Sequence, residues 1–229
     1  MKRRARPSSG FARAAKDSMR VPQAVWHRAA LCALALLALP PARQALESSM
    51  SVQMLVQFPL LALCGFVLAG ALPVRWRLRL DSWNGYGIAG LFAVALVMAI
   101  LMIPRVLDLA LADGRIELAK WLALVLAGAA LRVSWRRGGL LVQGFFLGNV
   151  LPMTAAVGQL YQDSPIRLCN SYLLDDQVRL GQMLVALAMA IGIAWFAQLI
   201  RVLMRREGAA LPPELDGSPV ALGPGERGG

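Results

Sequence analysis

The sequence contains a single histidine, His27, among 229 residues. A bis-histidine haem site, a histidine zinc site and a Ser-His-Asp triad all need histidines that this chain does not supply. No Walker-type phosphate-binding loop is present. Residues 85–90 match the Gly-x-Gly-x-x-Gly dinucleotide pattern by letters, but no strand is predicted before them. We therefore expect no enzymatic activity.

Cysteine is also scarce, with three residues that allow at most one internal disulfide. Cys32 and Cys64 fall inside apolar segments, whereas Cys169 falls in a polar connection. Partners in such different surroundings are not expected to meet, so we predict no structural bridge.

Charged residues make up only 16% of the chain, while 58% is hydrophobic and the mean hydropathy is +0.57. The apolar residues form long blocks, which predicts an all-α polytopic membrane protein with one helical domain. The net charge is +11. The basic residues lie between the apolar blocks and form no recognition surface, so they indicate membrane topology and no nucleic-acid partner.

Six apolar segments are predicted to form a bundle of six transmembrane helices, because a crossing needs about 20 residues. They span about 25–39, 51–73, 85–104, 117–133, 139–160 and 180–203. The first is short and ends at Pro40-Pro41, so a cleaved signal peptide is the alternative to a helix. A long basic leader and Arg43 near the would-be cleavage site favour the uncleaved helix. The predicted organisation is a basic tail (1–23), a transmembrane domain (24–204) and a disordered tail (205–229).

The connections between the segments alternate in basic content. One side of the membrane would hold 18 of the 24 Lys and Arg residues and the other side six. The positive-inside rule therefore places both termini in the cytoplasm and the connections near 41–50, 105–116 and 161–179 outside. We expect a multi-pass protein of a bacterial-type inner membrane, whose basic leader lies on anionic lipid.

Polar and sulfur-containing residues collect at the predicted outer ends of the helices. Since polar side chains at membrane depth usually face the bundle interior, a shared outward-facing pocket is predicted. Its candidate members are Met50, Gln53, Met54, Arg105, Asp108, Asn149, Met153, Cys169, Asp176 and Gln177. Met50 and Met54, four residues apart, would share one helix face.

Two interpretations of these residues remain open. Met50, Met54, Met153 and Cys169 are soft sulfur donors suited to Cu(I), or the methionines simply fill an apolar bundle. Arg105 and Asp108 are expected to pair with each other. Asp176 either orients a ligand or favours the start of the following helix. Gly144 and Gly148 predict close helix packing.

Two short motifs resemble the CtaG-type cytochrome c oxidase assembly factors of caa-type oxidases. That family shows His-Met-x-Gln-His at the outer start of its second helix, where this chain has Met50-Ser51-Val52-Gln53-Met54 before a Leu/Pro-rich run. Both family histidines are methionines here. The family also has an Asp-Gln before a Gly-containing helix, which Asp176 to Gly181 resembles. The similarity in topology covers about residues 24–204.

The resemblance implies an accessory protein for the assembly of a haem–copper oxidase, with copper as its cargo and oxidase subunits or other assembly factors as its partners. A thioether site would be tuned to Cu(I). A metal-free membrane scaffold and a small transporter component are the alternatives. The polar residues thin out towards the cytoplasmic half, which argues against a transport path through the membrane.

Overall fold

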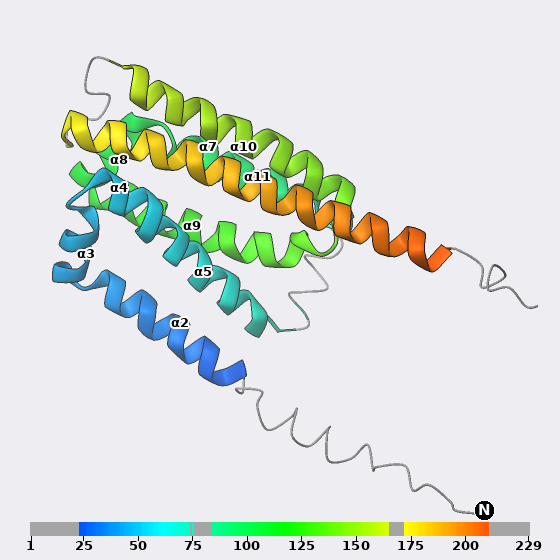
Figure 1. Cartoon of the computed structure of the whole chain (residues 1–229). Coiled ribbons are helices and arrows are strands. Elements are labelled where there is room, and N and C mark those ends of the chain that lie inside the picture. Colours follow the sequence, from blue (N-terminus) through cyan, green and yellow to red (C-terminus); the bar gives the residue numbers. More distant parts are fainter. Residues whose placement is uncertain (1–22, 74, 76–83, 165–171, 211–229) are drawn as a thin grey trace, which may run out of the picture. The chain divides into compact units, whose positions relative to one another are not determined.

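The structure is a computed structural model that describes residues 23–73, 75, 84–164 and 172–210. Throughout these residues the regular secondary structure is helical, which confirms the all-α prediction. The elements, of which Figure 1 labels the α-helices, are α2 (Gln23–Ala38), α3 (Pro40–Glu47), α4 (Met50–Val52), η1 (Gln53–Gln57), α5 (Phe58–Leu68), η2 (Ala69–Ala71), α7 (Ile88–Leu101), α8 (Pro104–Ala112), α9 (Gly114–Trp135), α10 (Gly139–Asp163) and α11 (Leu174–Ala210).

The described helices have the length and composition of membrane spans. Three continuous stretches qualify alone, namely Met50–Ala71, Gly139–Asp163 and Leu174–Arg205. Two bent pairs, α2 with α3 and α7 with α8, raise the number of candidate spans to five if each pair is one span. The protein is therefore a helical membrane protein.

Both bends measure 76° and begin at proline. Pro40 and Pro104 each occupy the first turn of the helix after the bend, where a missing N–H costs nothing. The sequence predicted loops over 41–50 and 105–116, and this was wrong for most of both stretches. They form α3 and α8, two short helices that turn away from the directions of α2 and α7.

Helix α5 packs between α2 and α9, and α7 lies against both α9 and α10 (Figure 1). Glycines set the distance between α5 and α9. A Cβ on Gly65 would stand 1.9 Å from the Val125 carbonyl oxygen, and one on Gly128 would stand 1.8 Å from that of Ala62. The close packing predicted at Gly148 was wrong, because a Cβ there meets nothing within 4 Å.

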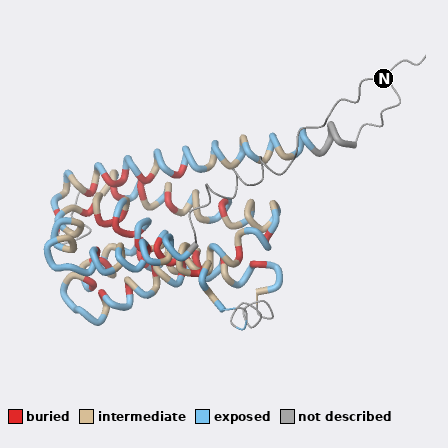
Figure 2. The backbone as a smooth tube through the Cα atoms, turned by 90° about the horizontal axis from the view of Figure 1, so that it is seen from below, coloured by how far each residue is buried: buried red, intermediate tan, exposed pale blue. Residues whose placement is uncertain are grey.

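One hydrophobic cluster joins the helices of the unit that ends at Met189. Its best-buried members include Met50, Leu61, Leu107, Leu124 and Tyr161. Figure 2 shows buried positions on the sides of helices that face other helices. The cluster also contains Leu37 of α2, so the first apolar segment contributes to the core.

The remaining described residues, 190–210, continue α11 and belong to a separate compact unit. The sixth segment was predicted to cover 180–203, but the helix starts at Leu174 and continues to Ala210. Residues 205–210 of the predicted disordered tail are therefore helical. The rest of that tail and residues 1–22 of the basic leader lie outside the described residues.

Candidate functional site

A π-helical turn lies at the centre of the candidate site. Ser49 caps the helix before it, since the Ser49 side chain accepts a hydrogen bond from the Val52 N–H. The chain then widens to a π-helix over Gln53–Gln57 before resuming an α-helix at Phe58. Such turns occur frequently at functional sites. Here the turn buries Gln53 and Gln57 completely.

Several methionines belong to the hydrophobic cluster that includes this turn, or pack against that cluster. Met50, Met54 and Met102 are buried in the hydrophobic cluster, and Met98 and Met153 pack against it. The structure thus brings together three of the four predicted sulfur donors. Cys169, the fourth, lies outside the described residues. Met183, in α11, is 50% exposed and does not belong to this cluster.

The Asp176 carboxylate holds the start of α4, about 125 residues away in the chain. Its Oδ2 accepts the Met50 N–H at 2.5 Å, and its Oδ1 accepts the Ser51 and Ser49 hydroxyls at 2.7 and 3.1 Å. The sequence left open whether Asp176 orients a ligand or favours the start of its own helix. Asp176 lies in the first turn of α11, and its side chain satisfies donors at the start of α4.

Two further residues, Tyr172 and Gln177, join the start of α11 to the rest of the candidate site. The Tyr172 hydroxyl lies 2.9 Å from Gln53 Oε1 and 3.1 Å from the Glu47 carbonyl oxygen. Gln177, which is 2% exposed, donates through Nε2 to the Tyr161 carbonyl oxygen at 3.2 Å. The Tyr161 hydroxyl in turn donates to the Met102 carbonyl oxygen at 3.0 Å. Segments far apart in the sequence therefore meet around the π-helical turn.

Four charged residues from α3 and α9 form a charge centre beside the glutamines. Arg43 pairs with both Glu47, at 3.2 Å, and Glu117. Lys120 donates to Glu47 Oε1 at 3.5 Å, and Gln57 Nε2 donates to the same oxygen at 3.4 Å. Glu117 and Lys120 are 5% and 3% exposed. With two cations and two carboxylates, the charge centre has no net charge when all four groups are ionised.

Three buried polar atoms near this region have no hydrogen-bond partner among the described residues. They are Gln53 Nε2, Gln57 Oε1 and Trp121 Nε1. An unsatisfied buried polar group costs on the order of 1–3 kcal/mol, so each atom calls for a partner that the described residues do not supply.

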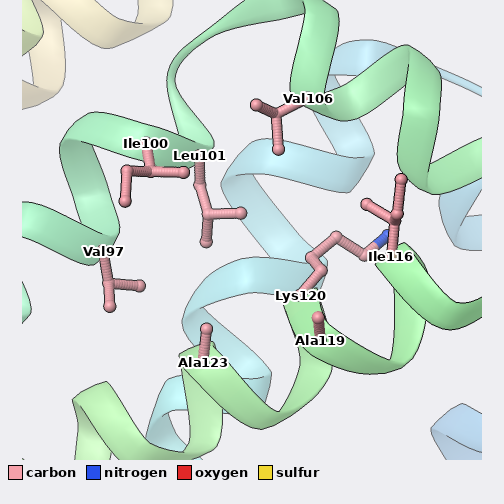
Figure 3. A pocket seen from close by; sticks show the side chains of 8 residues that line it. All are labelled: Val97, Ile100, Leu101, Val106, Ile116, Ala119, Lys120 and Ala123. Atoms are coloured by element: carbon pink, nitrogen blue, oxygen red, sulfur yellow. The ribbon is translucent and has the colours of Figure 1, made fainter.

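Two cavities lie next to α9 at this end. The first, of about 160 Å³, is formed by apolar side chains and by the aliphatic stem of Lys120. Figure 3 shows that stem along the cavity, with the nitrogen at its far end beside Ile116. The second, of about 360 Å³, is polar on one side, because Arg43, Glu117 and Trp121 line it together with Ala38, Gly114 and Leu118.

Three predicted site residues lie on outer faces of their helices or only partly inside. Arg105 is exposed and Asp108 is half-buried, both on α8. Asn149 is exposed on α10, and its Nδ2 donates to the Phe145 carbonyl oxygen of its own helix at 2.7 Å. The structure therefore does not bring Asn149 together with the methionines and glutamines.

The charge centre was not predicted from the sequence, although the positions of its charged residues give an indication of it. Glu117 and Lys120 stand in the first turns of an otherwise apolar segment, and Arg43 precedes Glu47 by four residues. Ionisable residues within a membrane segment indicate a functional site by default. That rule applied to 117–133 would have identified the α9 half.

The described residues contain no group of three or more His, Cys, Asp or Glu side chains arranged to hold a metal ion. In comparisons with known proteins, no family model, no curated protein and no solved structure matches this chain.

Proposed function

We propose that the chain crosses a bacterial-type inner membrane six times, with both termini in the cytoplasm. The asymmetry of Lys and Arg between alternate connections supports this topology. The helices α3 and α8 would lie at the outer boundary, where short amphipathic helices run along the interface. Helix α9 would be the fourth crossing, because Glu117 and Lys120 of this helix are each paired with a residue of α3 in the charge centre.

The function that we propose is a non-catalytic accessory role in haem–copper oxidase assembly, with Cu(I) handled by the methionine cluster. The observation that carries it is that Met50, Met54 and Met102 are buried in one hydrophobic cluster, with Met98 and Met153 packed against it. Two of these residues stand where the assembly-factor motif has histidines. Replacement of imidazole by thioether changes the preferred metal to a soft, monovalent ion.

The donor set and its surroundings are consistent with each other. Thioethers carry no charge, so a burial that would exclude carboxylate ligands is tolerated. The π-helical turn allows Met54 to reach the cluster from a helix whose spacing is locally widened. Oxidase subunits or other assembly factors would be the recipients of the ion.

Binding of Cu(I) tests the assignment directly. The purified full chain would be titrated with Cu(I) in competition with a chromophoric chelator under reducing conditions. Met50→Leu/Met54→Leu conserves side-chain volume, so the bundle should still fold. Met183→Leu/Met189→Leu is the matched control, because these methionines are 50% and 60% exposed. We expect at least about a tenfold loss of affinity, equivalent to about 1.4 kcal/mol, for the first pair only. Equal affinities for the two pairs would exclude the methionine site.

A deletion strain separates copper handling from a scaffold role. If the protein handles copper, added copper should restore oxidase activity at least in part. An oxidase defect that added copper does not relieve would favour a metal-free scaffold that holds subunits together.

A small transporter component is a second candidate, favoured by the charge centre. Buried ionisable residues in membrane proteins often belong to ion or substrate pathways. This function predicts that Lys120→Gln abolishes ion or solute flux in proteoliposomes while oxidase content in cells is unchanged. The absence of any flux above that of empty liposomes would exclude it.

A further inference from the structure

Two basic side chains converge on a glycine at the end of α9 that is opposite the charge centre. A Cβ on Gly70 of η2 would stand 3.0 Å from Nη2 of Arg132 and 3.3 Å from Nε2 of His27. These two nitrogens, from α9 and α2, are therefore within about 6 Å of each other. They border a space that is open because residue 70 has no side chain.

The Arg132 guanidinium is positioned by an aromatic ring. Its Cζ lies 5.1 Å from the centre of the Phe66 ring, which is a cation–π contact. No carboxylate among the described residues forms an ion pair with Arg132. A guanidinium has five N–H groups, and Arg132 is exposed, so it retains donors for an anion from outside the chain.

Positive charge at this end of the helices is not balanced by nearby acidic residues. Arg28 of α2 and Arg136 at the end of α9 are exposed and add to it. Within the unit that ends at Met189, the described acidic residues lie towards the other end of the helices (Figure 1). They are Glu47, Asp108, Asp113, Glu117, Asp163, Asp175 and Asp176. An anion at Gly70 therefore meets cations and no described carboxylate.

Exposed aromatic residues indicate that this end lies at the level of lipid headgroups. Trp26, next to His27, is 57% exposed, and Tyr86, just before α7, is 79% exposed. Tryptophan and tyrosine are enriched where a membrane protein meets the boundary between lipid and water. In the proposed topology this boundary is the cytoplasmic one, where anionic lipids attract basic residues.

We propose that Arg132 and His27 bind the phosphate of an anionic phospholipid such as phosphatidylglycerol, in the space over Gly70. The phosphate oxygens accept hydrogen bonds from the guanidinium and from the imidazole N–H at Nε2. Each such bond is about 2.8 Å long, so donors about 6 Å apart can both reach one phosphate group. Leu31, one turn after His27 on the same face of α2, is 56% exposed and contacts the acyl chains.

Phosphatidylethanolamine is the discriminating lipid, because it carries an ammonium group beside its phosphate. The described residues at this end offer no carboxylate to receive that ammonium, and Arg28 and Arg136 repel it. The purified full chain would be titrated with each lipid in detergent and the bound lipid measured by native mass spectrometry. We expect phosphatidylglycerol to bind at least about fivefold more tightly. Equal affinities for the two lipids would overturn the proposal.

Arg132→Gln separates a defined site from a general attraction to positive charge. We expect about a tenfold loss of phosphatidylglycerol affinity, because a charge-assisted hydrogen bond is lost. Arg136→Gln is the matched control, since it removes the same charge from an exposed position one turn away on α9. It should change the affinity less than about twofold. Equal losses for the two variants would show attraction by net charge alone and would overturn the site.

Gly70→Ala tests the same site without any change of charge. Its methyl group would lie against Arg132 and His27 and occupy the space assigned to the phosphate. We expect about a fivefold loss of phosphatidylglycerol affinity for this variant. Gly148→Ala makes the same substitution where a Cβ meets nothing within 4 Å, and it should leave the affinity unchanged. An unchanged affinity for Gly70→Ala would contradict the proposed position of the phosphate.

Free glycerol phosphate distinguishes a lipid from a soluble phosphate. Phosphatidylglycerol should bind far more tightly, because its acyl chains add apolar contact area. Comparable affinities for the two would overturn the lipid assignment. None of these measurements depends on copper, so this proposal and the copper proposal can fail separately.

Discussion

At the scale of residues, loss of one member of an ion pair in the charge centre should destabilise the protein more than loss of the whole pair. Lys120→Met leaves Glu47, which is half-buried and still paired with Arg43, with one cation fewer, and we expect a loss of about 1.5–3 kcal/mol in the free energy of unfolding. Lys120→Met/Glu47→Leu removes both members of one pair and should cost clearly less than the two single changes together. Thermal or denaturant unfolding of the purified chain measures these differences.

Arg115→Met is the control for that comparison, because Arg115 is exposed in the first turn of the same helix. Its change should alter stability by less than about 0.5 kcal/mol. Strictly additive effects for Lys120→Met and Glu47→Leu would show that the two side chains do not interact in the membrane-embedded protein.

The residues of the site could be predicted only in part from the sequence. Met50, Gln53 and Met54 are close in the chain, so helix periodicity alone places them together. Arg43 and Glu117 are 74 positions apart, and no local pattern links α3 to α9. Which charge pairs with which depends on how the two helices pack, and that is a property of the tertiary structure.

At the scale of elements, Asp176 links α11 to α4 through three donors. Asp176→Asn removes the charge and one acceptor oxygen, and we expect a loss of about 1.5–3 kcal/mol in unfolding free energy. Asp175→Asn is a matched control on the same helix turn, because Asp175 is exposed. Similar losses for both variants would mean that helix-dipole effects, and not the contact with α4, determine the result.

The contact between α5 and α9 depends on glycine at Gly65 and Gly128. Gly128→Ala would place a methyl group against the Ala62 backbone, so the helices must separate, at a cost of about 1–3 kcal/mol. Gly148→Ala meets no atom within 4 Å and should be neutral or stabilise by about 0.5–1 kcal/mol. Melting temperatures of the two variants measure this contrast, and a lower value for Gly148→Ala would contradict it.

The sequence predicted the long apolar helices better than the short helices that connect them. Apolar segment length located the helical stretch Met50–Ala71 and helices α7, α9 and α10 to within about three residues, because the membrane requirement is strong. Helix α11 was located too, but both of its ends lie beyond the predicted segment. The segments after Pro40 and Pro104 were predicted to be loops that connect the membrane helices. Their helices are short and amphipathic, with charged residues such as Arg43 and Asp108, so a hydropathy pattern alone does not reveal them.

At the scale of the whole molecule, the proposed topology makes α9 a crossing, and the charge centre would explain how α9 fits a membrane bundle. Alone, α9 is not among the three continuous stretches that are long and apolar enough to cross a membrane. Its Glu117 and Lys120 are paired with Arg43 and Glu47 from α3, so the four charges enter the bundle as a neutral group. A helix that is poor as an isolated span can thus cross as part of the assembled protein.

The proposed topology predicts opposite labelling at the two ends of α9. In a variant with its three cysteines replaced, Asp113→Cys should react with a membrane-impermeant maleimide added to intact spheroplasts, because Asp113 precedes α9 on the outer side. Arg136→Cys, which follows the helix, should react only after the membrane is permeabilised. Both positions are at least partly accessible in the structure, so access to the protein surface does not limit labelling. Labelling of both from outside would place α9 on the membrane surface. The charge centre would then lie outside the bilayer.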